Sequence, residues 1–125
     1  MAKLIMVVDD SASLRRVVNL ALTSAGYEVI EAADGVDALS KLAALAGKKV
    51  HLIISDVNMP RMDGIEFVTE LKKQPSFKFT PVIMLTTEGD DEIKNAGRVA
   101  GAKAWIIKPF NPDQMLNAVS KLILP

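Results

Sequence analysis

The chain alternates five times between a short run of β-branched and aliphatic residues and a longer amphipathic stretch. A strand-like run followed by a helical hydrophobic period is typical of a βα unit. Repetition of that unit predicts an α/β fold with a parallel sheet. We expect its strands at residues 4–8, 28–32, 50–55, 82–86 and 104–107.

The segments between these strands carry apolar residues at helical spacing. We expect the first helix to begin near Ser11 and end before Gly26, and the second to follow Asp34 and end by Gly47. Further helices are expected at about residues 65–73 and 90–100 and near Pro112. The residues expected to face the core in the first two helices are Leu14, Val17, Val18, Ala21, Leu22, Val36, Leu39, Leu42 and Ala43.

Composition restricts the kinds of site that the chain can form. It has no cysteine and one histidine, so any metal must be held by oxygen. Fifteen basic and fifteen acidic residues cancel, which argues against binding to nucleic acid. Short apolar runs and the lack of a signal peptide predict a cytoplasmic protein without a membrane partner. The length suits one domain over residues 1–125, without an effector domain.

Reactive side chains stand where the expected strands end. Asp9 and Asp10 follow the first strand, Asp56 the third and Lys108 the fifth, while Thr86 closes the fourth. The carboxyl ends of parallel strands share one edge of a sheet, so we expect these side chains to meet there. Grouped carboxylates repel one another unless a cation compensates, and Mg²⁺ prefers oxygen ligands of this kind. With Mg²⁺ and a lysine nearby, Asp56 is the best candidate for a nucleophile that forms an aspartyl-phosphate.

The same residues also form motifs: DD at 9–10, DVNMPRMDG at 56–64, LTTEG from Leu85 and KPF at 108–110. Together they resemble the response-regulator receiver domain over nearly the whole chain. The surrounding segments SLRRVV, EAADGVDAL and AGAKAWIIKPF are most similar to single-domain chemotaxis regulators of the CheY type. This resemblance implies a three-layer, flavodoxin-like (βα)5 doubly wound fold, with a parallel five-stranded sheet in the order 2-1-3-4-5.

The resemblance also implies a role for each acidic residue. Asp9 and Asp10 would hold Mg²⁺, Asp10 more directly, together with Asp56 and the backbone carbonyl of Asn58. Asp56 would become the 4-aspartylphosphate, so the chain would catalyse only its own phosphorylation and dephosphorylation.

Further roles follow from the same resemblance. Lys108 would pair with a phosphoryl oxygen, and the Thr86 hydroxyl would donate to another. Trp105 would be the aromatic residue that turns inward when Thr86 moves. Asn58 and Glu88 would set the lifetime of the phosphoryl group, which we expect to be short. The Lys108–Pro109 bond would be cis.

The resemblance implies a chemotaxis-type histidine kinase as phosphodonor to a monomer. A flagellar motor switch protein and a phosphatase would be its further partners. Binding would use the fourth helix, fifth strand and fifth helix around Lys103 and Trp105. An alternative output is relay of the phosphoryl group to a histidine phosphotransfer protein.

Two other classes fit less well. Haloacid-dehalogenase-like phosphatases also use an aspartate nucleophile and Mg²⁺, but usually need an aspartate where this chain has Asn58. A dinucleotide-binding module would need a G-x-G-x-x-G turn after the first strand, and Asp9-Asp10-Ser11 stands there instead.

Taken singly, each residue has a plainer interpretation. Acids before a helix commonly cap it, and an aspartate after a strand commonly forms a turn. Trp105 could be a core residue of the fifth strand. His51 lies far from the expected site, so we assign it no function. Met59 and Met62 are expected to pack the loop after Asp56.

Overall fold

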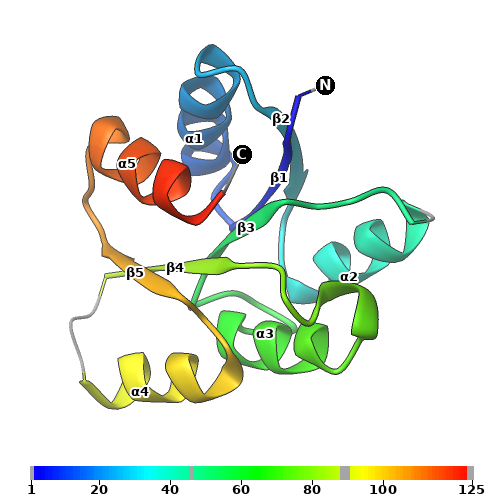
Figure 1. Ribbon diagram of the computed structural model, residues 1–125. Coiled ribbons are helices and arrows are strands. Elements are labelled where there is room, and N and C mark those ends of the chain that lie inside the picture. Colours follow the sequence, from blue (N-terminus) through cyan, green and yellow to red (C-terminus); the bar gives the residue numbers. More distant parts are fainter. Residues whose placement is uncertain (1, 46, 88–90, 124–125) are drawn as a thin grey trace.

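A five-stranded parallel sheet forms the middle layer of the molecule. The computed structural model describes residues 2–45, 47–87 and 91–123. The strands lie in the order β2-β1-β3-β4-β5, which confirms the predicted topology (Figure 1). Their bounds are β1 Leu4–Val8, β2 Glu28–Ala32, β3 Leu52–Asp56, β4 Val82–Thr86 and β5 Ala104–Ile107.

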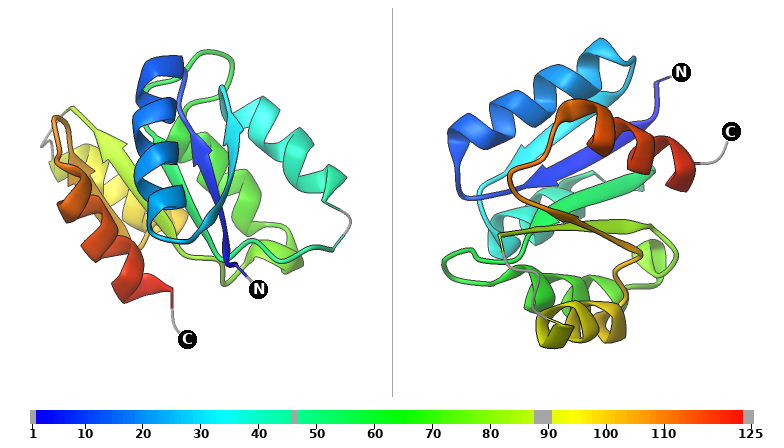
Figure 2. Two further views of the ribbon diagram at one scale, coloured as in Figure 1. Left: turned by 90° about the horizontal axis from the view of Figure 1, so that it is seen from above. Right: turned by 90° about the vertical axis from the view of Figure 1, so that its left-hand side faces the viewer.

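Helices cover both faces of this sheet, as the two views in Figure 2 show. The helices are α1 Ala12–Ser24, α2 Gly35–Ala44, α3 Gly64–Lys72, α4 Asp91–Ala100 and α5 Pro112–Leu122, with a 3₁₀ turn η1 at Pro75–Phe77. Helices α1 and α5 lie on one face, and α2, α3 and α4 on the other. The result is the three-layer arrangement predicted from the sequence. No helix among the described residues is both long and apolar enough to cross a bilayer.

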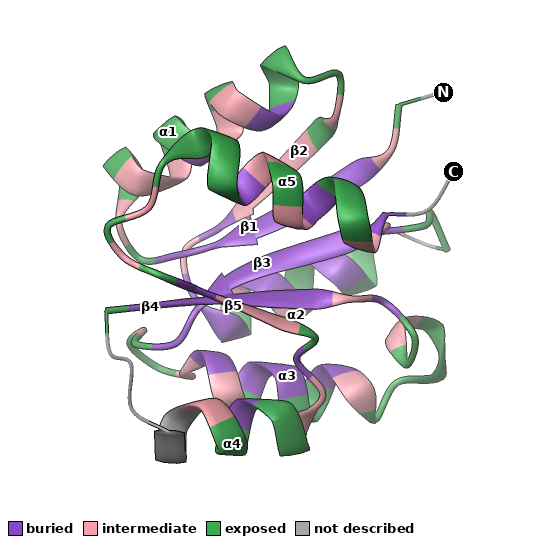
Figure 3. Cartoon of the chain, turned by 60° about the vertical axis from the view of Figure 1, so that its left-hand side comes forward, coloured by how far each residue is buried: buried purple, intermediate pink, exposed green. Residues whose placement is uncertain are grey.

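The sheet separates two apolar cores. Successive side chains of a strand point to opposite faces, so Met6 packs with α2 and α3 while Val7 packs with α1 and α5. Each central strand is therefore apolar except near its carboxyl end, which explains the hydrophobic runs. Figure 3 shows the central strands β1, β3 and β4 buried between more exposed helices.

The inward faces of α1 and α2 differ in part from the prediction. Val18 and Leu22 of α1 and Ala38 and Leu42 of α2 are buried, but Val17 is 51% and Val36 40% exposed. Ala43 is also exposed. Since adjacent helical residues lie about 100° apart, the one next to a buried position turns toward solvent. The predictions for Val17, Val36 and Ala43 were therefore wrong.

The bounds of two elements also differ from the prediction. Strand β3 begins at Leu52 and includes Asp56, whereas we expected it to span residues 50–55. The expected helix start at residue 90 lies outside the described residues, and α4 begins at Asp91.

His51 joins the starts of β1 and β3. Its backbone N–H donates to the Leu4 carbonyl at 2.8 Å, and its Nδ1 accepts from the Leu4 N–H at 3.0 Å. Burial lowers the pKa of His51, and the charges of Lys49 and Lys3 lower it further. The ring is therefore neutral in the fold, with its acceptor nitrogen in use, as a structural role requires.

We predict that His51→Asn, whose side-chain oxygen can replace Nδ1 as acceptor, will lose less stability on acidification than the native chain. Because the pKa of folded His51 lies below the ordinary 6.5, the unfolded chain takes up the proton first, and stability falls as pH drops through that value. Urea unfolding from about pH 7 to about pH 5 measures this. Equal pH dependence of the two proteins would contradict it.

Candidate functional site

Three carboxylates meet at the carboxyl edge of the sheet. Oxygen atoms of Asp9, Asp10 and Asp56 lie within 4.8 Å of one another. Asp9 and Asp10 follow β1, and Asp56 ends β3, which is the neighbouring strand. Asp9 is 1% and Asp56 6% exposed, while Asp10 lies at the surface. The predicted convergence is present, in a site with two buried acids and one that solvent reaches.

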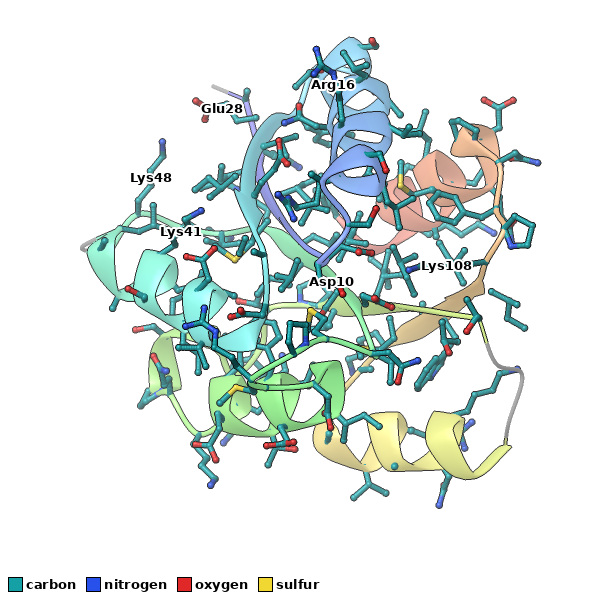
Figure 4. The ribbon with its side chains drawn as sticks, turned by 180° about the vertical axis from the view of Figure 1, so that it is seen from behind. Asp10, Arg16, Glu28, Lys41, Lys48 and Lys108 are labelled. Atoms are coloured by element: carbon teal, nitrogen blue, oxygen red, sulfur yellow. The ribbon has the colours of Figure 1, made fainter. Side chains whose placement is uncertain are left out.

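Lys108 brings a positive charge to the two buried acids. Its Nζ lies 3.2 Å from Asp9 Oδ2 and 3.2 Å from Asp56 Oδ1. It follows β5, on the other side of β4 from Asp56, and Figure 4 shows it at the same edge as Asp10. One ammonium group offsets only part of the charge of three ionised carboxylates, so the cluster can attract a further cation.

Backbone groups orient the acids. Asp9 Oδ1 accepts from the Ser11 N–H at 2.8 Å, and Asp56 Oδ1 accepts from the Val57 N–H at 2.9 Å. Arg15 also donates to the Asp9 carbonyl. The N-cap of α1 is Ser11, so the plainer interpretation of Asp9 and Asp10 as caps does not describe their position.

The surroundings of Asp56 disfavour its charge. Burial raises the pKa of Asp56 first, and the neighbouring Asp9 charge raises it further, against the opposing effects of Lys108 and the Val57 N–H. A divalent cation among these oxygens would reverse that balance.

The donor set fits Mg²⁺. Asp9, Asp10 and Asp56 offer hard oxygen ligands close together, and the exposed Asp10 leaves room for water and a phosphoryl oxygen. A bound Mg²⁺ would supply positive charge to a transferring phosphoryl group. The carbonyl of Asn58 as a further ligand stays a prediction.

Gly64 lets the first turn of α3 lie directly against Asp56. A Cβ at this position would stand 2.1 Å from the Asp56 carbonyl oxygen and 2.7 Å from Met84 Cε. The Gly64 N–H also donates to the Val57 carbonyl at 2.8 Å, closing the loop after β3. Any larger residue would displace the strand end that carries Asp56.

An ion pair that sequence reasoning missed holds the middle of this loop. Arg61 Nε donates to Asp34 Oδ2 at 2.8 Å, and Nη2 to Oδ1 at 3.0 Å. Asp34 is buried and caps α2 by accepting from the Asp37 N–H at 2.8 Å. Among the residues that the structure describes, Arg61 is the only non-glycine residue with positive φ (64°). The sequence predicted that a helix follows Asp34, but not that Asp34 pairs with Arg61.

The predicted switch residues Thr86 and Trp105 lie on β4 and β5, the two strands that follow β3 in the sheet. Thr86, at the end of β4, is fully buried. Trp105 is half-buried on β5, in register with Met84 of β4, and packs against the core on the α3–α4 face. The Lys108–Pro109 bond is cis, as predicted. Met59 and Met62 pack against the same core, and Glu88 lies outside the described residues.

Comparison with known proteins agrees with this geometry. The family model for the response regulator receiver domain matches residues 5–120. The chain is 41% identical over 121 residues to Chemotaxis protein CheY1 of Helicobacter pylori, covering 96% of this chain and 95% of that protein. It is 38% identical over 115 residues to Protein PilG of Pseudomonas aeruginosa, covering 92% and 83%. The chain therefore belongs to the response regulator receiver domain family.

Solved structures support the same assignment. Chemotaxis response regulator CheY4 of Vibrio cholerae superposes with a TM-score of 0.90 at 45% identity, over 98% of this chain and 99% of that chain. The receiver domain of sensor histidine kinase PA1611 from Pseudomonas aeruginosa PAO1 superposes with a TM-score of 0.86 at 25% identity, over 98% of each chain. That second structure holds a magnesium ion coordinated in its active-site cleft.

We predict that Asp56→Asn will stabilise the Mg²⁺-free protein, because its environment disfavours the charge that the substitution removes. A gain of about 1 kcal/mol would raise the thermal midpoint by a few degrees in a domain of this size. Circular dichroism melts with and without Mg²⁺ measure it. Asp10→Asn is the matched control: it removes an exposed carboxylate of the same cluster, so it should gain less stability but also weaken Mg²⁺ binding. A lower midpoint for Asp56→Asn would contradict this account.

We predict that Arg61→Ala will weaken Mg²⁺ binding by about three- to tenfold, because the loop after Asp56 loses its link to Asp34. Mg²⁺ titration followed by Trp105 fluorescence gives the affinity. Arg61→Gly, which suits the positive φ, separates the lost ion pair from backbone strain. Lys73→Ala removes an exposed cation at the C-cap of α3 that pairs with Glu70, and should leave the affinity unchanged. Equal affinities for Arg61→Ala and the native chain would contradict the prediction.

Proposed function

We propose that this chain is a phosphoacceptor switch in which Asp56 takes a phosphoryl group from a phosphohistidine of a histidine kinase. Receiver domains work with histidine kinases in two-component systems, so the class of partner follows from the family. The observation that carries the proposal is the meeting of three carboxylates with Lys108 at one edge of the sheet. In our proposal, one receiver domain spans residues 1–125 and works as a monomer in the cytoplasm.

The transfer begins with Asp56. Its Oδ1 contacts Lys108 and the Val57 N–H, and neither of these contacts involves Oδ2. One carboxylate oxygen attacks phosphorus, the N–P bond to histidine breaks as the O–P bond forms, and the donor nitrogen keeps the electron pair.

Lys108 and Thr86 then hold the product. The ammonium group of Lys108 turns from the carboxylate toward a phosphoryl oxygen and stays near Asp9, at 3.2 Å in the present structure. The buried Thr86 hydroxyl donates to another phosphoryl oxygen. These contacts favour one arrangement of the β4–α4 loop and of Trp105, so phosphorylation shifts a conformational equilibrium. Water later cleaves the acyl phosphate, and Asn58 and Glu88 give the phosphorylated state a short lifetime.

An apolar hollow of about 410 Å³ next to Lys108 supports the approach of a protein donor. Leu14 and Val17 of α1 line it on one side, and Phe110 and Pro112 on the other. Exposed apolar groups beside an acidic centre suit a partner that docks while presenting a phosphorylated side chain. A small-molecule phosphatase would instead need an enclosed pocket and an acid at position 58.

We further propose that the output is docking in chemotaxis, on a flagellar motor switch protein, through α4, β5 and α5. Two similar proteins, of Helicobacter pylori and Vibrio cholerae, are named chemotaxis proteins. On this face Val99 is 81% and Ile107 43% exposed, and Lys103 is exposed between them in the sequence. A phosphatase partner would end the signal. Relay to a histidine phosphotransfer protein is the alternative output of the same site.

We predict that acetyl phosphate with Mg²⁺ will add one phosphoryl group at Asp56 and none to Asp56→Asn. Intact-mass measurement and peptide mapping after borohydride reduction identify the site. Thr86→Ala should accept the group but lose most of the Trp105 fluorescence response, because the contact that couples the two is missing. Labelling of another residue, or of Asp56→Asn, would refute the proposed function.

A further inference from the structure

Helix α4 contains a glycine that no turn requires. Gly97 is buried in the interior of the helix Asp91–Ala100 and does not have a positive φ. Glycine is the least favourable helical residue after proline, because it loses the most backbone entropy on folding. A glycine at this position therefore points to a packing constraint on the side where a side chain would stand.

That constraint is the ring of Trp105. A Cβ at position 97 would stand 2.2 Å from Cζ2, 2.8 Å from Cη2 and 3.3 Å from Cε2 of the indole. All three atoms belong to the six-membered half of a rigid double ring, so no single atom can move aside alone. Either the whole ring or the helix would have to shift.

Trp105 and α4 belong to a layer of packed side chains that extends to Asp56. Trp105 lies on β5 in register with Met84 of β4, and both belong to the core on the α3–α4 face. The end of the Met84 side chain faces Gly64, whose backbone lies against the Asp56 carbonyl. Figures 1 and 2 show α4 beside α3 on this face of the sheet. Close packing transmits a displacement at one end of such a layer to the other.

We propose that Gly97 is a positioning residue that forms the seat of the Trp105 indole, so that the ring and α4 move together when the switch changes state. The proposal rests on the proposed function, in which Trp105 is the switch aromatic. Phenylalanine at position 105 would lack the outer atoms of the indole, and would need no glycine opposite. Tryptophan at position 105 therefore requires glycine at position 97.

The test is a double-mutant cycle of the native chain, Gly97→Ala, Trp105→Phe and the double variant. Thermal midpoints by circular dichroism, without Mg²⁺ or phosphoryl mimic, report on the seat. Gly97→Ala should lower the midpoint when Trp105 is present, because the new methyl group meets the ring. It should raise the midpoint in the Trp105→Phe background, where only the better helix propensity of alanine is left.

Asn95→Ala is the matched control, since Asn95 is exposed on the same helix and the change also improves helix propensity. It should raise the midpoint in both backgrounds. If Gly97→Ala raises the midpoint in both backgrounds as well, the seat does not exist and the proposal is overturned.

Calorimetric titration with beryllofluoride in Mg²⁺ tests the link to the switch without needing fluorescence. Gly97→Ala should change the affinity by about fivefold or more with Trp105 present, and by less than about twofold with phenylalanine. Unchanged affinity in the Trp105 background would overturn the proposal even if the midpoints behave as expected. Beryllofluoride binding that survives in Asp56→Asn would instead overturn the proposed function, while the midpoints still decide the seat.

Discussion

The repulsion between Asp9 and Asp56 is the constraint on which the rest of the structure depends. The two acids lie at the carboxyl ends of neighbouring parallel strands, Asp9 just after β1 and Asp56 as the last residue of β3. Both are almost fully buried, a position in which two uncompensated charges would be costly. Lys108, which reaches both, comes from the far side of β4. Strand order, the two-sided core and the loop after β3 together bring these three residues to one place.

The buried charge of Asp56 lowers the stability of the fold. Burial of Asp56 raises its pKa, so the charge that the proposed roles of nucleophile and metal ligand require also disfavours the fold that holds it. The surrounding backbone limits this cost with a donor at Val57 and a close approach at Gly64. A cation or a phosphoryl group that offsets the unfavourable charge of Asp56 would therefore also stabilise the neighbouring backbone at this edge of the sheet.

Much of the fold and the site could be predicted from the sequence, because both follow from local pattern. Four of the five strands have the predicted bounds, since short β-branched runs between turn residues leave little choice of register. The convergence of Asp9, Asp56 and Lys108 followed from the parallel sheet alone. Contacts between elements could not be foreseen in the same way. Arg61 and Asp34 are 27 positions apart, and the approach of Gly97 to Trp105 depends on how one helix sits on one strand. The orientation of Val17 likewise depends on a rotation of α1 that periodicity does not resolve.

The reciprocal pair of hydrogen bonds between Leu4 and His51 gives β1 and β3 a joint at their amino ends, and Lys108 links the acids at their carboxyl ends. The two strands are thus linked at both their amino and their carboxyl ends. A conformational change that keeps both links would have to take place in other elements, such as β4, β5 and α4. In the proposed switch, the link at the amino ends would remain when Lys108 turns from Asp56 to a phosphoryl oxygen, so β1 and β3 would stay paired while the carboxyl edge rearranges.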